Sequence, residues 1–288
     1  MTRKTIIKLL VSLAALVILV LLVRTFVGDG SIGGRIAVVD IIGTITKSDK
    51  VIELIHQYRD NGSVKAIVVR IDSPGGSVAP VQEIYSELKK LDKPVVASLG
   101  GTAASGGYYI ASAADEIFAN PGTLTGSIGV IMQFVKMKAL FDKVGVNQQT
   151  VKSGEFKDTG SPVRDLTPEE KELLQATIDD VHSQFIDAIF DTRKDRLTRS
   201  EVQALADGRI FSGNQALEYK LVDRLGNLPD AVAHAAELAG IEGKPRITRV
   251  KHEPSLLERI IGISGTHALE DFFDGTGVLF RYELSFAE

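Results

Sequence analysis

A strand-to-helix turn around Ser105 constrains the fold of this chain more than any other feature. The β-branched run over residues 94–101 is typical of a strand buried on both faces, and apolar residues continue at helical spacing after Ser105. Gly106 and Gly107 follow at once, although each glycine costs about 1 kcal/mol relative to alanine inside a helix. The pattern therefore predicts that the start of this helix needs residues without a side chain.

Ser105 itself allows two interpretations. The first N–H groups of a helix have no intrahelical acceptor and lie at the positive end of the helix dipole, so they could hold an oxyanion beside a nucleophilic serine. The alternative is that Ser105 is only an N-cap residue and that the glycines serve close packing. Both interpretations stay open at this point, and the rest of the chain bears on the choice.

The segments before this turn alternate between strand and helix patterns. Strand patterns cover residues 35–43, 64–72 and 94–101, and amphipathic helical patterns cover residues 47–58 and 80–91. This alternation predicts an α/β fold with a parallel sheet and right-handed crossovers. Ligands bind such sheets at the carboxyl ends of the strands, and both glycine-bearing loops of this region fall at that edge.

The second half of the chain carries stronger helix signals. We expect two strands within residues 115–134, a short helix over 136–144, and a strand running into a long loop over 148–167. Thr167–Glu170 is a capping box with proline at the first helical position. It predicts a helix of about seven turns, with Leu173 on its apolar stripe.

The N-terminus carries an apolar segment that predicts a membrane anchor. Residues 9–23 contain no charge, and Lys8 and Arg24 can snorkel, which extends the span to the ~20 residues that a bilayer core requires. Basic residues are concentrated before the segment, so the positive-inside rule places the N-terminus in the cytoplasm and the rest of the chain outside. A cleaved signal peptide is the alternative, but no A-x-A cleavage site follows. We expect a single-pass protein of the cell membrane, with an uncleaved anchor over residues 1–27 and a linker over 28–34.

Composition excludes several classes of function. The 288 residues carry a formal net charge of −4, which gives no indication of nucleic-acid binding. The chain contains no cysteine, so thiol nucleophiles, disulfides and cysteine-ligated metals are excluded. It also lacks tryptophan, which argues against a surface that stacks bases or sugars. We expect neither a metal nor a cofactor.

A nucleophilic serine needs a base, and the histidines are badly placed for that role. His56, His182 and His234 fall on predicted helices and the remaining two lie in the C-terminal tail, so a Ser–His–Asp triad has little support. A lysine can act as the base where burial lowers the pKa of its ammonium group. One loop offers Lys152 and Lys157, although a lysine in a loop is usually solvated.

Two more glycine-rich segments add backbone donors and a hydroxyl group. Ser73–Ser77 lacks the lysine of a phosphate-binding P-loop, but its glycines expose backbone N–H groups beside a strand end. The N–H groups of Gly76 and Gly106 could form a two-donor oxyanion hole, and the alternative is a plain glycine turn between a strand and a helix. Ser127, within Thr125–Gly129, adds a hydroxyl that could hold an amine in place.

Together these motifs resemble the signal peptide peptidase A family of membrane-anchored serine proteases. The shared motifs are DSPGGS at 72–77, AASGGYYIA at 103–111, GTLTGSIGV at 122–130 and KSGEFKD at 152–158. The resemblance implies the fold shared by Clp protease and crotonase, a parallel sheet with flanking helices. Residues 35–243 would form this Ser-Lys peptidase domain, and residues 244–288 a C-terminal tail without an assigned role.

Carried over residue by residue, the resemblance makes Ser105 the nucleophile and Lys157 the general base. Gly76 and Gly106 match the oxyanion-hole glycines, and Ser127 matches the serine that hydrogen-bonds the lysine. The chain resembles the short form of the family, with one copy of the domain. Since the long form builds each site from a lysine of one copy and a serine of the other, the resemblance implies a homo-oligomeric ring with active sites shared between subunits.

The activity that the resemblance implies is cleavage of signal peptide remnants and other short apolar peptides at the outer face of the membrane. Two other classes of function stay open at this point. A crotonase-type hydratase or thioesterase shares the fold and would polarise an acyl-CoA thioester, although an extracytoplasmic domain would meet no CoA. A non-catalytic membrane scaffold of the same fold would only assemble or bind peptides.

Overall fold

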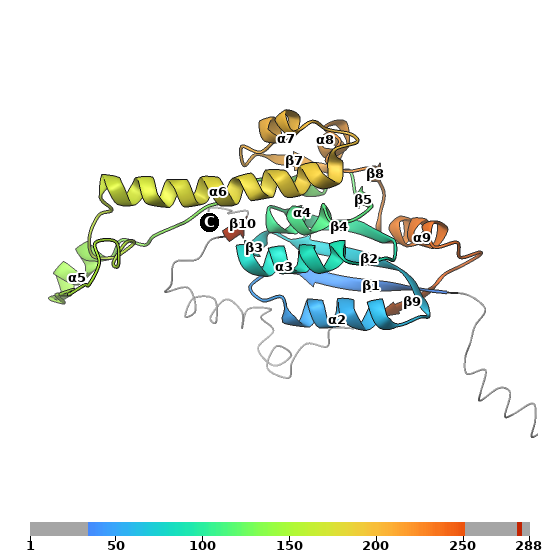
Figure 1. Ribbon diagram of the computed structural model, residues 1–288, viewed down its shortest axis with the longest axis horizontal. Helices are drawn as coiled ribbons and strands as arrows, with labels where there is room; N and C mark the ends of the chain where they lie inside the picture. Colours follow the sequence, from blue (N-terminus) through green and yellow to red (C-terminus); the bar gives the residue numbers. More distant parts are fainter. Residues whose placement is uncertain (1–33, 251–280, 284–288) are drawn as a thin grey trace, which may run out of the picture.

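The structure is a computed structural model that describes residues 34–250 and 281–283 (Figure 1). The strands are β1 (Arg35–Ile42), β2 (Val64–Ser73), β3 (Gly75–Ser77), β4 (Val95–Ala104), β5 (Glu116–Ala119), β6 (Leu124–Gly126), β7 (Ile210–Ser212), β8 (Arg224–Leu225), β9 (Arg246–Arg249) and β10 (Arg281–Glu283). The helices are α2 (Asp49–Asp60), α3 (Val78–Lys89), α4 (Gly106–Ala111), α5 (Lys138–Val144), α6 (Pro168–Arg193), α7 (Arg199–Leu205), α8 (Gly213–Glu218) and α9 (Leu228–Leu238).

An eight-stranded sheet forms the centre of the molecule. Its strand order is β7-β6-β4-β2-β1-β9, and β5 pairs with β4 and β8 beside this path. The pairings within this sheet are parallel except for β6 with β7. A second, antiparallel sheet joins β3 to β10. The predicted α/β fold with a mainly parallel sheet and flanking helices is therefore confirmed.

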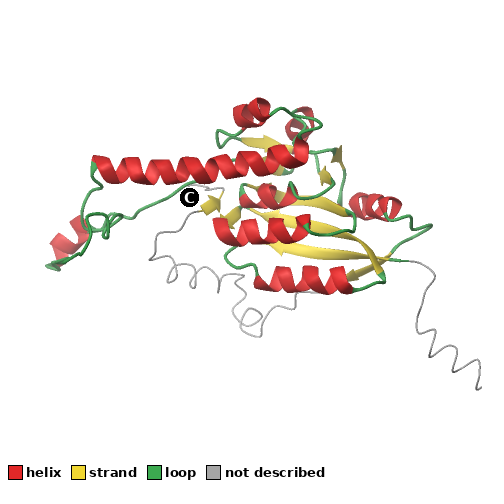
Figure 2. Cartoon of the chain, in the orientation of Figure 1, coloured by secondary structure: helices red, strands yellow, loops and turns green. Residues whose placement is uncertain are grey.

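The sheet is covered on both faces, as the β-branched runs predict. Alternate residues of β1 and β2, such as Val39 and Val69, pack with helices α2, α3, α4 and α6 in the main core. Their neighbours Val38 and Val68 pack on the other face with the alanine-rich side of α9. Because successive side chains of a strand point to opposite faces, each central strand contributes to both cores. Figure 2 shows this helix–sheet layering.

Several local predictions differ from the structure. Residues 148–167 contain no strand and form turns and irregular structure. Leu173 is 46% exposed rather than buried, because the N-terminal half of α6 extends beyond the sheet and has no core beneath it (Figure 1). The sheet also continues past residue 243, since β9 pairs with β1 and the Arg249 guanidinium bonds the Asp40 carboxylate at 2.6 Å.

Residues 131–166 form a projecting arm that carries α5 and runs along the overhanging half of α6 (Figure 1). The two segments that lead into and out of the arm are joined by a hydrogen bond, which the Met137 N–H donates to the Pro162 carbonyl at 2.7 Å. Its apolar side chains Val135, Val144 and Val151 are exposed. The arm therefore presents a partly apolar surface that the body of the same chain leaves uncovered.

The predicted anchor over residues 1–27 and the linker over 28–34 lie outside the described residues, apart from Gly34. Within the described part of the chain, none of the helices combines the length and the apolar character that a membrane crossing requires.

Candidate active site

Ser105 occupies the turn between β4 and α4 in a conformation that non-glycine residues rarely adopt. Its φ is 52° and its ψ is −118°, and the residue is 1% exposed. Its side chain does not cap α4, and its Oγ is buried without a hydrogen-bond partner among the described residues. Such a backbone costs of order 1–3 kcal/mol and is found mainly at functional sites. The interpretation of Ser105 as an ordinary N-cap residue therefore loses its support.

Neighbouring backbone groups hold this turn in place. The Ser105 N–H donates to the Gly126 carbonyl at 2.8 Å, and the Ser105 carbonyl accepts from the Tyr109 N–H at 2.9 Å. An added Cβ at Gly107 would lie 2.9 Å from the carbonyl oxygen of Ser73. Gly107 therefore serves the close approach of α4 to the end of β2, which is the packing role that the sequence left open for the glycines.

Gly76 and Gly106 supply backbone beside this serine. Gly106 is the first residue of α4, so its N–H has no acceptor within the helix. Gly76 lies in β3, which packs against α4, and a Cβ on Gly76 would lie 2.1 Å from the carbonyl oxygen of Ile45. Only glycine fits at this position. The structure thus brings both predicted oxyanion-hole glycines to the segment around Ser105.

Ser127 lies at the end of the neighbouring strand. Ala104 pairs with Gly126 in the β4–β6 ladder, so Ser105 and Ser127 each follow a paired residue at the same sheet edge. Ser127 is buried, its φ is 50°, and its N–H donates to the Arg209 carbonyl at 2.8 Å. Among the described residues, the non-glycine positions with positive φ are Ser105, Ser127 and Lys220. Two of the three residues with this uncommon backbone conformation therefore lie at the candidate site.

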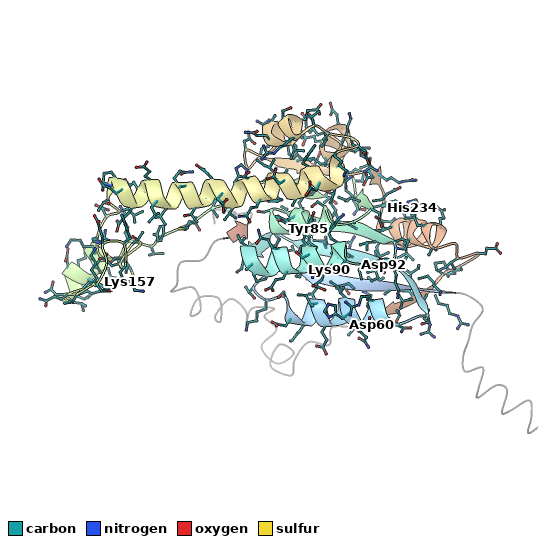
Figure 3. All side chains as sticks on the ribbon, in the orientation of Figure 1. Asp60, Tyr85, Lys90, Asp92, Lys157 and His234 are labelled. Atoms are coloured by element: carbon teal, nitrogen blue, oxygen red, sulfur yellow. The ribbon has the colours of Figure 1, made fainter. Side chains whose placement is uncertain are left out.

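Lys157 lies elsewhere in the same chain. Figure 3 shows it on the arm, at the far end of the molecule's longest axis from α4. The residue is exposed, and its side chain has no hydrogen-bond or ion-pair partner among the described residues. The ammonium group of Lys152, by contrast, bonds the Asp158 carboxylate and the Glu155 carbonyl, each at 2.6 Å. The chain brings Ser105, Gly76, Gly106 and Ser127 together but leaves its own Lys157 apart from them.

Charged side chains fix the arm to the start of α6. The guanidinium of Arg164 bonds the carboxylates of Asp158 and Glu170, each at 2.8 Å. Hydrogen bonding from Arg164, and then from Lys152, holds the pKa of Asp158 far below its usual range. Bonding from Arg164 likewise lowers the pKa of Glu170 to about 2. Both carboxylates are therefore ionised at neutral pH, and this network keeps the segment next to Lys157 attached to α6.

None of the described histidines bonds the hydroxyl of Ser105. His56 on α2 bonds Glu87 at 2.6 Å, and His234 on α9 lies 3.1 Å from the Glu116 carboxylate. His182 lies on α6, and its Nε2 is buried without a partner among the described residues. The arrangement agrees with the weak support for a Ser–His–Asp triad in the sequence.

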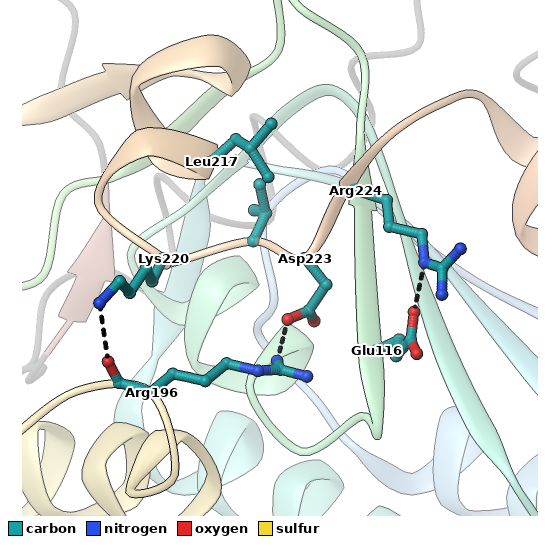
Figure 4. Close-up of a pocket in the computed structure, with 7 residues that line it drawn as sticks. Glu116, Arg196, Leu217, Lys220, Asp223 and Arg224 are labelled. Atoms are coloured by element: carbon teal, nitrogen blue, oxygen red, sulfur yellow. Dashed lines mark hydrogen bonds and ion pairs between the residues drawn. The ribbon is translucent and has the colours of Figure 1, made fainter.

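One cavity at the start of β5 does not belong to this site. Its volume is about 260 Å³, and it is lined by Glu116, Arg196, Leu217, Lys220, Val222, Asp223 and Arg224 (Figure 4). Ion pairs cross it, including Arg224 with Glu116 at 2.8 Å. Glu116 begins β5, so the cavity lies toward the amino ends of the parallel strands rather than their carboxyl ends. Within residues 34–250, no cluster of metal-ligating side chains is present.

Comparison with known proteins decides the family. The model of peptidase family S49 matches residues 87–242, and that of Clp protease matches residues 34–124. The chain belongs to peptidase family S49. This S49 chain is therefore a serine peptidase related to signal peptide peptidase A, as its motifs indicate.

Curated relatives of this S49 peptidase agree with that assignment. A putative protease of Synechocystis sp. is 42% identical over 249 residues, which cover 85% of this chain and 88% of that protein. A putative signal peptide peptidase SppA of Enterococcus faecium is 39% identical over 181 residues, or 62% of this chain and 52% of that protein. A chloroplastic serine protease SPPA of Arabidopsis thaliana is 36% identical over 216 residues, or 73% of this chain and 31% of that protein. The chain thus spans about half or less of the two longer relatives.

Proposed function

We propose that this S49 peptidase is a membrane-anchored endopeptidase that uses Ser105 as nucleophile and Lys157 as general base. The observation that carries the proposal is the buried Ser105 Oγ, which has no partner among the described residues in a turn of uncommon conformation. A hydroxyl in this state is available to an external base. The family membership makes proteolysis the reaction for which such a hydroxyl is used.

In the proposed mechanism, the neutral amine of Lys157 takes the proton of Ser105 while the serine oxygen attacks a peptide carbonyl. The N–H groups of Gly76 and Gly106 stabilise the tetrahedral oxyanion, and such a donor is worth about 3–4 kcal/mol. The lysine then gives its proton to the leaving amine, and water hydrolyses the acyl-enzyme. The Ser127 hydroxyl holds the amine in position between these steps.

We propose that each active site combines Ser105 of one subunit with Lys157 of another. Two observations support this arrangement: Lys157 is exposed on the arm, away from α4 (Figure 3), and the arm carries exposed apolar side chains. Contiguous apolar surface on a soluble domain commonly marks an interface. A second copy of the chain that covers the arm would desolvate the lysine, which favours its neutral form.

We further propose that the substrates are signal peptide remnants and other short apolar peptides at the outer face of the membrane. The relative named for signal peptide peptidase and the apolar segment at residues 9–23 support this assignment. An anchor followed by a short linker would keep the catalytic domain close to the bilayer, where such remnants are released. The N-terminus would then be cytoplasmic and the peptidase domain extracytoplasmic.

Mixed oligomers test the shared site directly. Chains with Ser105→Ala and chains with Lys157→Ala are each expected to be inactive alone. Co-assembled, they should regain activity, because some sites then contain one intact serine and one intact lysine. Peptidase activity is measured on oligomers that native mass spectrometry shows to contain both variants. Mixed oligomers as inactive as either parent would place the dyad within one chain or leave Lys157 without a catalytic role.

A further inference from the structure

The strand that carries Ser105 contains a bulge shortly before this residue. β4 pairs with β2 in regular register as far as Leu99, and the next residue of β4 that pairs with β2 is Ala103. Between these two pairs, one residue of β2, Asp72, lies opposite three residues of β4. A bulge bends its strand and redirects the side chains that follow, and bulges are common next to active sites. The bulge at residues 100–102 therefore decides where β4 places Ser105 at the start of α4 (Figure 1).

The carboxylate of Asp72 lies against the bulge from the side of β2. Its Oδ1 accepts a hydrogen bond from the Thr102 N–H at 3.0 Å. An added Cβ at Gly100 would lie 2.7 Å from the Asp72 Cγ, so a side chain at this position would displace the carboxylate. A bulge leaves backbone groups without their ladder partners. Asp72 therefore supplies the acceptor that the ladder does not offer to Thr102.

Two threonines hold the bulge from the side of β6. The Thr123 hydroxyl donates to the Gly100 carbonyl and the Thr125 hydroxyl donates to the Ala103 carbonyl, each at 2.7 Å. Both threonines are buried, so water does not compete for these hydrogen bonds. Ala103 precedes Ser105 by two residues, which makes the bond from Thr125 the nearer of the two to the nucleophile. Together the two bonds fix the path of β4 across the bulge.

We propose that Asp72 and Thr125 are positioning residues, which hold the bulge of β4 so that Ser105 keeps its uncommon backbone conformation. The inference rests on the proposed function, because it takes Ser105 as the nucleophile. Neither side chain needs to touch the substrate in this role. A small displacement of the attacking oxygen lowers the rate of attack strongly, whereas contacts that bind the peptide elsewhere are unchanged. Loss of either side chain should therefore lower kcat and leave KM nearly unchanged.

Substitutions at Thr125 test this role in the full-length chain, with a short apolar peptide that carries a fluorogenic leaving group as substrate. Thr125→Val keeps the shape of the side chain but removes the hydroxyl, and Thr125→Ser restores a hydroxyl. We expect Thr125→Val to lower kcat about tenfold with KM changed by less than about twofold, and Thr125→Ser to keep kcat within about threefold of the wild-type value. Thr192→Val is the matched control, since the Thr192 hydroxyl bonds carbonyls of its own helix α6, and should keep the wild-type kcat. Equal kcat in Thr125→Val and Thr192→Val overturns the proposal.

Substitutions at Asp72 test the other side of the bulge. Asp72 is exposed, so its variants keep the test available even if the buried Thr125→Val fails to fold. Asp72→Asn keeps an oxygen that can accept from the Thr102 N–H, and we expect it to retain most of kcat, whereas Asp72→Ala should lower kcat about tenfold. Equal losses in the two variants overturn the role of the hydrogen bond. Since both residues act on one bulge, Asp72→Ala combined with Thr125→Val should lose less than the product of the single losses. A loss equal to the product overturns the shared role.

A fluorophosphonate probe distinguishes failure of this inference from failure of the proposed function. The probe labels an activated serine, and we expect it to label Ser105 in the wild-type chain and about tenfold more slowly in Thr125→Val and Asp72→Ala. Absence of labelling in the wild-type chain would remove Ser105 as the nucleophile. Labelling of all three chains at equal rates would leave Ser105 as the nucleophile and overturn only the positioning role of the bulge.

Discussion

The turn at Ser105 and the arm that carries Lys157 are stabilised by different kinds of interaction. Around Ser105 the backbone is buried and closely packed, and an added Cβ at Gly107 would meet the carbonyl oxygen of Ser73. On the arm the side chains are mostly exposed, and an added Cβ at Gly154 would meet nothing within 4 Å. Apolar packing holds the first region, whereas ion pairs around Arg164 hold the second.

This difference indicates what each member of the proposed Ser-Lys dyad needs from its surroundings. A serine held at positive φ needs a rigid surrounding that prevents relaxation, and the core of a single chain provides it. A lysine that acts as a base needs removal from water, which the arm of one chain does not provide for Lys157. Folding of one chain therefore holds the serine in its uncommon conformation. We propose that assembly with a second chain removes the lysine from water.

The largest effects should come from removing either member of the proposed dyad. We expect Ser105→Ala and Lys157→Ala each to lower kcat/KM by at least about 10³-fold, since general-base and nucleophile losses lie in this range or above it. Lys152→Ala is the control on the same arm and should keep most of the activity, because its ammonium already bonds Asp158 and the Glu155 carbonyl. If Lys157→Ala kept the wild-type kcat/KM, Lys157 would not be the general base, and the residue in that role would be unassigned.

The pH dependence of the reaction should distinguish a lysine base from a histidine base. A base acts in its deprotonated form, so kcat/KM should rise about tenfold for each pH unit below its pKa. With a lysine base we expect the rise to continue into mildly alkaline buffer. A midpoint near 6.5 is typical of histidine. His182, whose Nε2 is buried on α6, is the residue to replace as a check. A midpoint near 6.5 that His182→Gln abolishes would contradict the lysine assignment.

A smaller effect, on stability, should separate the packed turn from the arm. Gly107→Ala places a Cβ 2.9 Å from the Ser73 carbonyl oxygen, and such overpacking costs about 1–3 kcal/mol. Gly154→Ala meets nothing within 4 Å and should change the free energy of unfolding by less than about 0.5 kcal/mol. Urea denaturation followed by circular dichroism measures both variants. Equal stability of the two would mean that the turn is less rigid than its packing indicates.

Local sequence patterns predicted most of the regular structure. The alternation of strands and helices before Ser105 and the capping box at Thr167 both appear as expected. Each of these signals depends on residues that are close together in the sequence, so it can be recognised without knowledge of the fold. The strand expected within residues 148–167 is absent, because that segment leaves the body of the protein and has no neighbouring strand to pair with.

The sequence by itself determined which residues are candidates for the chemistry: a serine before two glycines, glycine-rich strand ends and a lysine in a loop. Only the tertiary structure decided how they stand to one another. Gly76 fits against Ile45, Ser127 lies beside Ser105, and β10 pairs with β3 through contacts between distant parts of the chain. Such contacts depend on the whole sheet, and no local pattern records them. For the same reason, the separation of Lys157 from its own Ser105 became visible only in the folded chain.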